Sequence, residues 1–409
     1  MTDLDAFSAD ARAFLDAHAP RRSATSDQFV WGEGSDAVGV LDERSEEEEA
    51  AEVAAAKEWK RTEFDAGFGW ITGPTEYGGR ALTGEHERIY RGLLSDYQIP
   101  NQHPFLIGLG MIAPTILAHA IPAVREQYLR PLYRGDIIAC QLFSEPVAGS
   151  DLAGIQTKAE RDGDEWVITG QKVWTSGAQY SDIGEILTVT SPDKPRHRNL
   201  TAFVIDMHAP GVEVRPLRQM TGGASFNEVF LDEVRVPDSH RLGDVDAGWG
   251  VALTTLMNER AAIGGSGGGG GGGSITRFVE MARHFGCADD PVVRQALARL
   301  YELNMVASLN NRRAAQKLKA GQMPGPEGSL GKMSLVAAMQ HGTHLVSEIL
   351  GPRLVADTGE WGTYSWGEYV MGLSGMRIAG GTDEIMRNII GERVLGLPKE
   401  AKPPSPTAT

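Results

Sequence analysis

The pattern of apolar and polar positions divides the chain into three parts, and the first is helical. In Ala6–Ala17 apolar residues recur at helical spacing, and the Ala-rich run Ala50–Trp59 is a strong helix former. Four glutamates, 46–49, precede that run and suit a helix N-terminus, where negative charge is favourable. Asn101–Ala120 is apolar with many small residues, which indicates a closely packed helix. We therefore expect a helical domain over residues 1–138.

Residues 139–245 change to short strand-like runs separated by Gly, Pro and Asp. Trp166–Trp174 consists of two β-rich runs around Thr169-Gly170. No G-x-G-x-x-G motif follows a strand, which disfavours a βαβ dinucleotide-binding unit and a nicotinamide dehydrogenase. The pattern predicts a β-barrel or sandwich. Its further strands are expected at Glu185–Thr190, Leu200–Met207, Gly211–Arg218 and Asn227–Val236.

Helical spacing returns over residues 246–397. Leu253, Leu256, Met257 and Arg260 follow an i, i+3, i+4, i+7 pattern, and residues 291–317 and 332–350 carry long apolar stripes. The last twelve residues, 398–409, hold four prolines and are expected to be a disordered tail.

One segment breaks the helical pattern. Residues 264–274 contain nine glycines in eleven positions. Each glycine costs a helix about 1 kcal/mol relative to alanine, so we expect a flexible linker or lid. A phosphate-binding loop is the weaker interpretation, because no Lys-Ser or Lys-Thr follows.

The composition narrows the class of protein. The formal net charge of the 409 residues is −15, which argues against nonspecific nucleic-acid binding, since that requires a basic surface. Two cysteines, Cys140 and Cys287, exclude a disulfide framework and fit a reducing compartment. No run approaches the roughly 20 apolar residues of a membrane span, and the acidic N-terminus lacks the basic region of a signal peptide. We expect a cytoplasmic protein with no membrane contact.

Three short segments carry candidate chemistry. Gln141-Leu-Phe-Ser-Glu-Pro-Val-Ala-Gly-Ser-Asp151 is rich in glycine and short polar residues, whose backbone N–H groups can approach a planar polar ligand. Lys172-Val-Trp-Thr-Ser-Gly177 places a tryptophan, usually a core residue, at the end of a strand run. In Arg377-Ile-Ala-Gly-Gly-Thr-Asp-Glu384, Thr382 is a natural helix N-cap followed by two acids. Taken singly, each segment is explained as an ordinary turn, strand or cap.

Together these segments resemble the acyl-CoA dehydrogenase family, over nearly the whole chain and least over the first 60 residues. The resemblance implies an α+β fold: an N-terminal helical domain, a central β-barrel or sandwich, and a C-terminal four-helix bundle. It implies FAD as cofactor and α,β-dehydrogenation of an acyl-CoA thioester. No iron–sulfur or haem ligands appear in the sequence, so electrons are expected to pass to an electron-transfer flavoprotein. The implied assembly is a homotetramer, or a heterotetramer with a related subunit.

The resemblance also implies roles for individual residues. Gln141, Phe143 and Ser144 would contact the isoalloxazine ring, and Ser150 would lie near the CoA portion of the substrate. The remaining implied flavin contacts are Trp174 beside the ring, the Ser176 hydroxyl toward N5, Arg283 at the pyrophosphate, and Thr382 and Glu384 at the nucleotide.

The chain departs from the commonest family pattern at the position of the catalytic base. Gly380 stands where many members place the catalytic glutamate. Glu259 is our candidate instead, because isovaleryl- and long-chain-type members carry an inward glutamate on this helix just before an arginine. Helical geometry groups Glu259 with Ala252 and Thr255 on a small-residue face. Arg260 faces elsewhere and is expected to orient substrate or flavin. Without the resemblance, Glu259 and Arg260 would be read as a solvated pair.

Two further departures concern contacts between subunits. Met281-Ala-Arg-His-Phe-Gly286 is one residue shorter than the Arg, Phe-Gly pattern of many relatives, and Glu348-Ile-Leu-Gly351 replaces a common Gln-x-Leu-Gly. These departures point to a different seating of FAD or to a partner that is not an identical copy.

Two alternatives to an acyl-CoA dehydrogenase stay open. The first is a catalytically silent subunit, since relatives acting on bulky sterol side chains pair two unlike chains around one base; an intact Glu259 argues against it. The second is a flavin monooxygenase or nitroalkane oxidase on the same fold, which would use oxygen directly. The acyl group is not specified, although the base position and the Gly-rich segment suggest a branched or bulky one.

Overall fold

The elements begin and end where local sequence signals place them, as helix α2 illustrates. In the computed structural model, α2 spans Glu46–Asp65, and Ser45 caps it in a reciprocal capping box with Glu48. The structure describes residues 3–22, 29–38, 45–265, 274–319 and 325–399. The chain divides into two compact units, here called unit 1 (Met1–Phe29 and Leu41–Glu259) and unit 2 (Val30–Val40 and Arg260–Thr409).

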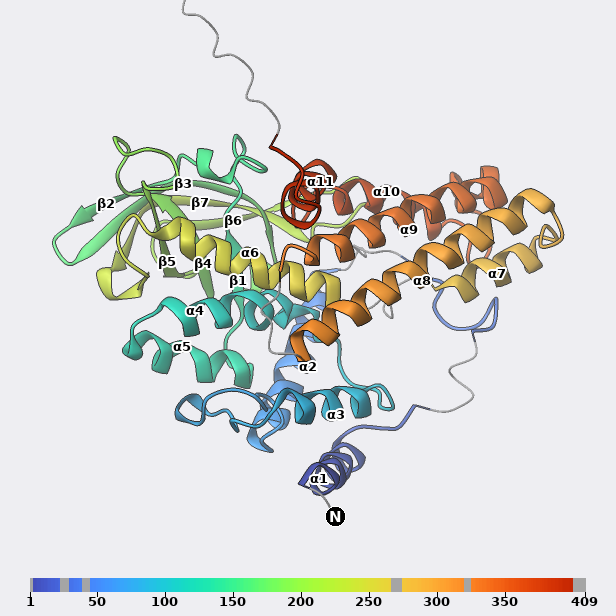
Figure 1. The fold of residues 1–409 in the computed structure, drawn as a ribbon, viewed down its shortest axis with the longest axis horizontal. Coiled ribbons are helices and arrows are strands. Elements are labelled where there is room, and N and C mark those ends of the chain that lie inside the picture. Colours follow the sequence, from blue (N-terminus) through green and yellow to red (C-terminus); the bar gives the residue numbers. More distant parts are fainter. Residues whose placement is uncertain (1–2, 23–28, 39–44, 266–273, 320–324, 400–409) are drawn as a thin grey trace, which may run out of the picture. The chain divides into compact units, whose positions relative to one another are not determined.

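Unit 1 opens with helices where the apolar spacing predicts them. The predicted helix at Ala6–Ala17 lies within α1, Asp3–His18, and buries Phe7, Phe14 and Leu15. The glutamate run 46–49 forms the first turn of α2, as expected. The remaining helices of this part are α3 (Gly84–Leu94), α4 (Ala113–His119) and α5 (Pro122–Arg134) (Figure 1).

The segment Asn101–Ala120 is not the single helix that its composition suggests. It contains a 3₁₀ turn at His103–Phe105, a π-helical turn at Gly108–Ile112, and then α4. Pro114 has no N–H to donate within the helix, so the regular hydrogen-bond ladder is interrupted near this position. At the junction the Ala113 N–H instead bonds the Gly108 carbonyl.

A single mixed sheet of eight strands follows, in the order β6-β7-β3-β2-β4-β5-β8, with β1 paired in parallel to β4. All predicted strands are present. The break expected at Thr169-Gly170 lies inside one long strand, β3. The bulge at this point belongs to β7, where Asp232 and Glu233 oppose Thr169 alone. The strands are β1 (Ala139–Leu142), β2 (Lys158–Asp162), β3 (Glu165–Ser176), β4 (Ile183–Val189), β5 (Leu200–Asp206), β6 (Val212–Leu217), β7 (Phe226–Pro237) and β8 (Arg241–Leu242).

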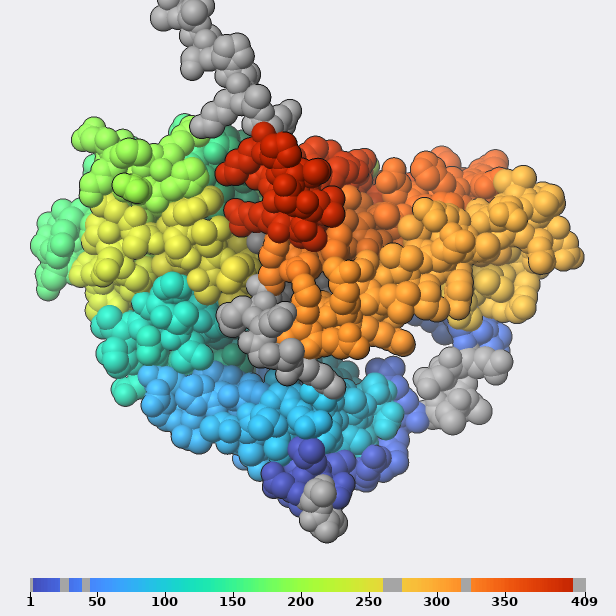
Figure 2. Space-filling view, viewed as in Figure 1, coloured from blue at the N-terminus to red at the C-terminus, as the bar shows by residue number. Residues whose placement is uncertain are grey.

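Helix α6, Gly248–Gly265, lies between the sheet strands and helices α4 and α5, as its yellow residues show between green and teal (Figures 1 and 2). Its buried side is formed by Val251, Ala252 and Thr255. Of the residues whose spacing predicted this helix, Leu253 is 37% and Met257 40% exposed, whereas Leu256 packs against the core. The predicted helix is confirmed, and its small buried side chains allow a close approach to α4 and the sheet.

Unit 2 is a helical bundle built on the two predicted long helices. They are α8, Pro291–Lys319, and α9, Gly328–Leu350. Its core contains Phe278, Val346 and Trp366. The other helices are α7 (Ile275–His284), α10 (Trp366–Met376) and α11 (Asp383–Ile389), and α11 continues as a π-helical turn at Ile390–Val394.

A segment from the N-terminal part of the chain, residues 30–38, packs on this bundle. Trp31 stacks on His284 and makes an edge contact with Trp361, and Val38 is 1% exposed in the bundle core. The Arg277 guanidinium donates a hydrogen bond to the Ala37 carbonyl at 2.8 Å. Nothing in the hydrophobic pattern of the sequence predicts this crossover.

The structure tests only part of what the sequence predicts for the Gly-rich segment, the C-terminal tail and the domain bounds. Helix α6 continues through Gly265, so the first two residues of the predicted Gly-rich loop are helical. Residues 266–273 of that loop and residues 400–409 of the predicted tail lie outside the described residues. The domain bounds at 138 and 245 stay a prediction. No helix within the described ranges is long and apolar enough to cross a membrane.

The core of unit 1 encloses a carboxyl group that forms no ion pair with any described residue. Glu185 on β4 is 0% exposed, and the Thr255 hydroxyl donates to its Oε1 at 2.7 Å. Thr255 also shares a hydrogen bond of 2.9 Å with Thr115. The Glu185 Oε2 has no hydrogen-bond partner among the described residues. Burial raises the pKa of Glu185 to about 8, from an ordinary value of 4.5.

We expect the variant Glu185→Gln to gain stability relative to the parent as pH rises from 5 to 8. In that window folded Glu185 keeps a proton that the unfolded chain releases, so the parent loses stability with rising pH. One pKa unit corresponds to about 1.4 kcal/mol, so the full difference is roughly 4 kcal/mol. Thermal unfolding midpoints across this pH range provide the measurement. Glu302→Gln, on an exposed residue of α8, is the control, and parallel pH profiles for parent and Glu185→Gln would contradict the assignment.

Candidate active site

The first predicted flavin segment forms the end of β1 and a tight turn. Gln141 is half-buried and pairs in register with Glu185 of β4. Phe143 is buried and Ser144 is half-buried. The turn closes through two hydrogen bonds between the backbones of Glu145 and Ala148, of 2.9 and 3.0 Å. The structure thus holds the three predicted ring contacts, 141, 143 and 144, on one short rigid segment.

Ser150 lies at the open end of this segment and is exposed. The neighbouring Asp151 accepts a hydrogen bond from Arg196 at 2.6 Å. Arg196 belongs to the loop between β4 and β5, which also carries Lys194 and Arg198. One cation of this loop, Arg196, therefore contacts the residue that follows Ser150.

The second predicted segment is a bulge at the end of β3. Lys172 pairs with Val229 of β7 and Thr175 pairs with Asn227. Residues 173 and 174 of β3 therefore oppose a single residue of β7, Glu228. Trp174 has a φ of 61° in the left-handed region and is 61% exposed. A bulky residue in this conformation is strained, and such strain is concentrated at functional sites.

The two segments meet directly. The Val173 N–H donates to the Ser144 carbonyl at 2.9 Å, which joins the turn after β1 to the bulge of β3. Ser176, two residues after Trp174, is half-buried. We call residues 141–145 and 172–176 the strand-end cluster. It contains five of the predicted flavin contacts: Gln141, Phe143, Ser144, Trp174 and Ser176.

Sequence reasoning missed the ion pair inside this cluster. Lys172 and Glu145 are buried, and the Lys172 Nζ lies 2.8 Å from the Glu145 Oε1. The signal available was a lysine within a run of strand-forming residues, two positions before the tryptophan already singled out. Because β3 carries two register shifts, simple alternation did not show which way this lysine points.

The candidate base lies on α6. Glu259 is half-buried, one helical turn beyond the buried Thr255. The predicted small-residue face is packed at Ala252 and Thr255, since both are fully buried and Thr255 bonds Glu185. The side chain of Arg260 lies outside the described part of the chain. The roles of Glu259 and Arg260 stay predictions.

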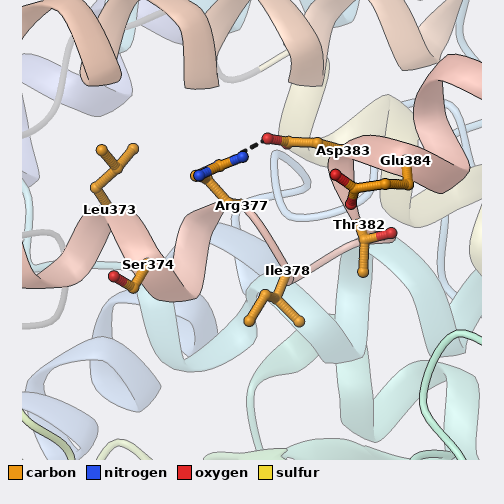
Figure 3. Close-up of a pocket in the computed structure, with 7 residues that line it drawn as sticks. All are labelled: Leu373, Ser374, Arg377, Ile378, Thr382, Asp383 and Glu384. Carbon is orange, nitrogen blue, oxygen red and sulfur yellow. Dashed lines mark hydrogen bonds and ion pairs between the residues drawn. The ribbon is translucent and has the colours of Figure 1, made fainter.

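In unit 2 two predicted nucleotide contacts, Thr382 and Glu384, line a cavity of about 340 Å³ (Figure 3). Thr382 caps α11, as expected, by accepting a hydrogen bond from the Ile385 N–H at 3.2 Å. Figure 3 shows Arg377 pointing to Asp383, at 2.8 Å, while Glu384 is exposed. The cavity is lined by Leu373, Ser374, Arg377, Ile378, Thr382, Asp383 and Glu384.

A buried lysine fixes the loop that precedes α11. Lys332 of α9 donates to the Gly381 carbonyl at 2.6 Å and to the Arg377 carbonyl at 3.2 Å. Gly380 and Gly381 both have left-handed φ values, of 66° and 95°. Position 380 is therefore held in a conformation that suits glycine and strains a glutamate.

Arg283 does not line this cavity; it lies in the last turn of α7. Its side chain is exposed and pairs with Glu280 at 2.6 Å. The next residue, His284, stacks on Trp31 from the crossing segment 30–38. The structure describes Arg283 as a surface cation, and its predicted contact with the pyrophosphate stays untested.

The comparisons with known proteins agree on one family. The model of the acyl-CoA dehydrogenase middle domain matches residues 140–234, and that of the acyl-CoA dehydrogenase C-terminal domain matches residues 246–395. The acyl-CoA dehydrogenase IpdE1 of Mycobacterium tuberculosis is 32% identical over 98% of this chain and 100% of its own. The acyl-CoA dehydrogenase FadE34 of the same organism is 38% identical over 85% of this chain. The chain spans only 48% of the length of FadE34.

The solved structure of the Tcur3481-Tcur3483 steroid ACAD has a similar fold, with a TM-score of 0.74 and 23% identity. The match covers 97% of this chain and 98% of that one. The helical, β and helical order predicted from the sequence is therefore confirmed as the fold. Because both domain models and IpdE1 match it, the chain belongs to the acyl-CoA dehydrogenase family of flavin-dependent oxidoreductases.

Proposed function

We propose that this chain is an FAD-dependent acyl-CoA dehydrogenase that introduces an α,β double bond into an acyl-CoA thioester. Its electrons would pass to an electron-transfer flavoprotein. The observation that carries the proposal is the hydrogen bond between Val173 and Ser144, of 2.9 Å. It joins two of the segments that the family uses around its flavin, although they are distant in the sequence.

Each unit, taken by itself, offers residues that suit part of a flavin nucleotide. The strand-end cluster offers the exposed indole of Trp174 for a planar ring and the hydroxyls of Ser144 and Ser176 for its polar edge. In unit 2 the cavity of about 340 Å³ lies within the size range of ligand pockets and presents Arg377 and Thr382 as polar groups. Glu384 and Arg283 complete the proposed FAD contacts. When bound, FAD would supply the oxidant that takes the hydride from the β-carbon of the substrate.

The proton at the α-carbon needs a base from the protein, and we assign that role to Glu259. Its half-buried position on α6 allows both access to substrate and partial removal of water, which tunes a carboxylate toward its task. The left-handed φ of Gly380 supports the assignment, because the loop that holds the base in many members is built here around glycine. Arg260 would orient the substrate, and Ser150 would contact its CoA portion.

A second function is a partner subunit in a hetero-oligomer. The steroid ACAD with a similar fold is named for two components, Tcur3481 and Tcur3483. An unlike partner would also account for the shortened segment that carries Arg283. A bulky, steroid-like acyl group is accordingly the substrate class that we favour.

Anaerobic titration with straight, branched and steroid-like acyl-CoA thioesters tests the proposal. We expect the purified yellow protein to lose flavin absorbance with at least one thioester, and most completely with the bulky ones. A colourless protein, or a yellow one that no thioester bleaches, would instead support the partner-subunit function. Rapid reaction of the reduced flavin with oxygen, without bleaching by any thioester, would support an oxidase.

The variant Glu259→Gln should lose flavin reduction by acyl-CoA while keeping its bound flavin. Removing a general base typically costs 10²- to 10⁴-fold in rate, so we expect a loss of about 10³-fold. Stopped-flow absorbance under anaerobic conditions measures the rate, and the same change at an exposed glutamate, Glu302→Gln, is the control. Parent-like reduction by Glu259→Gln would rule out this base.

Moving the glutamate to the position used by many family members should not restore activity. In the double variant Glu259→Gln/Gly380→Glu, the new side chain has to adopt a left-handed φ, which costs about 1–2 kcal/mol. We expect a lower unfolding midpoint and no recovered flavin reduction. Gly92→Glu is the matched control, because Gly92 lies inside α3 with open space around it and is expected to tolerate the change. Recovered turnover in the double variant would show that position 380 can carry the base.

A further inference from the structure

We propose that Lys172 and Glu145 are positioning residues for the flavin. Their buried ion pair fixes the spacing between the turn that begins at Phe143 and the bulge that carries Trp174. The inference rests on the proposed function, because it assigns a purpose to the strand-end cluster as a flavin-binding edge.

Lys172 meets all of its hydrogen-bonding needs within the protein. Its ammonium group donates to the Glu145 carboxylate at 2.8 Å, to the Phe143 carbonyl at 3.1 Å and to the Leu187 carbonyl at 2.8 Å. An ammonium group has three N–H donors, so each one has an acceptor. These acceptors come from the turn after β1 and from β4, and the lysine itself belongs to β3.

Glu145 extends the connection to β2. Its carboxylate accepts a hydrogen bond from the Gln156 N–H at 2.6 Å and another from the Thr157 N–H at 3.0 Å, immediately before β2 begins. Four segments therefore converge on one ion pair: the turn after β1, the start of β2, the end of β3 and the middle of β4. Both side chains are almost fully buried, at 0% and 3% exposure.

Such a pair is a poor device for stability alone. Removing two charges from water is unfavourable, and apolar residues of similar volume often serve a core equally well. Burial lowers the pKa of Lys172 to about 8. Burial would raise the pKa of Glu145, but the charge and hydrogen bond of Lys172, together with hydrogen bonds from Thr157 and Gln156, outweigh it, so that pKa is lowered. What the pair provides is direction, since each hydrogen bond fixes the position of a specific backbone atom.

The position of the ion pair in the strand explains why directional hydrogen bonds are needed here. Lys172 is the last regular residue of β3 before the bulge, and Trp174 follows with its strained left-handed φ of 61°. A strained residue keeps its conformation only when its neighbours determine it. Lys172 anchors the strand on one side of Val173, and the bond from Val173 to Ser144 anchors the bulge to the turn. Loss of the pair would free the turn and the bulge to move apart.

Three variants separate positioning from stability. Lys172→Met leaves Glu145 as an uncompensated buried charge, whereas Lys172→Met/Glu145→Met removes both charges and keeps the volume. Lys60→Met is the control, because Lys60 forms a comparable ion pair with Glu63 on α2, at 2.6 Å and with side chains 15% and 4% exposed. The measurements are the unfolding midpoint of the flavin-free protein, the dissociation constant of FAD and the visible absorption spectrum of the bound flavin.

We expect Lys172→Met to lower the unfolding midpoint and to weaken FAD binding by at least 10-fold, with a shifted flavin spectrum. The double variant should recover part of the unfolding midpoint but not the FAD affinity or the spectrum. Lys60→Met should lower the midpoint while keeping FAD affinity within about twofold. Glu145→Gln, which keeps the side-chain shape, carries the same test in milder form if the methionine variants do not fold.

The inference is overturned if the double variant binds FAD with the affinity and spectrum of the parent, or if Lys60→Met weakens FAD binding as much as Lys172→Met at an equal loss of midpoint. Failure of the proposed function looks different. In that case the parent itself binds no FAD, or its bound flavin is not reduced by any acyl-CoA, whatever the variants do.

Discussion

A buried charge needs partners inside the protein, and in unit 1 that requirement brings four segments of the sheet to one point. The ammonium group of Lys172 has acceptors on the turn after β1 and on β4, and Glu145 carries the connection to β2. An apolar core leaves side chains free to shift slightly, because its contacts are not directional. The ion pair, in contrast, fixes the backbone atoms that it bonds, and it belongs to the strand-end cluster that we assign to the flavin. The geometry of the proposed site is in this sense set by electrostatics rather than by hydrophobic packing.

The same unit contains a second buried carboxyl group, Glu185, which differs from Glu145 in that it is expected to be neutral. Glu185 pairs with no cation in the part of the chain that the structure describes, and it is expected to stay protonated near neutral pH, because burial raises its pKa to about 8. Its link through Thr255 reaches α6 one turn before Glu259. The helix that carries the proposed base is therefore held to the sheet by a hydrogen bond as well as by packing. In unit 2, Lys332 holds the loop before α11 in a conformation that requires glycine at 380, which agrees with a base supplied from elsewhere.

Much of this arrangement could be predicted from the sequence. The elements were predicted from local patterns, and the flavin contacts from the family resemblance. Strand runs such as Leu200–Met207 and long apolar stripes such as 332–350 predicted elements correctly, because local periodicity reports which face is buried. The N-cap at Thr382 was predicted because capping depends on a few adjacent residues. The roles of the flavin residues came from the family resemblance, since no local rule distinguishes Ser144 from any other turn serine.

Features that depend on distant contacts were missed. The sequence grouped Ala252 and Thr255 on one face of α6, but it did not show that this face is buried and that Thr255 bonds Glu185. The Lys172–Glu145 pair joins residues 27 positions apart, and the crossing of residues 30–38 to unit 2 leaves no periodic signal. The most direct test of the central claim is a crystal structure of the protein with FAD and a non-reacting acyl-CoA analogue. The account predicts the isoalloxazine ring against Ser144, Trp174 and Ser176, with the Glu259 carboxylate about 3 Å from the α-carbon proton. A ring bound away from the strand-end cluster, or Glu259 turned from the analogue, would contradict it.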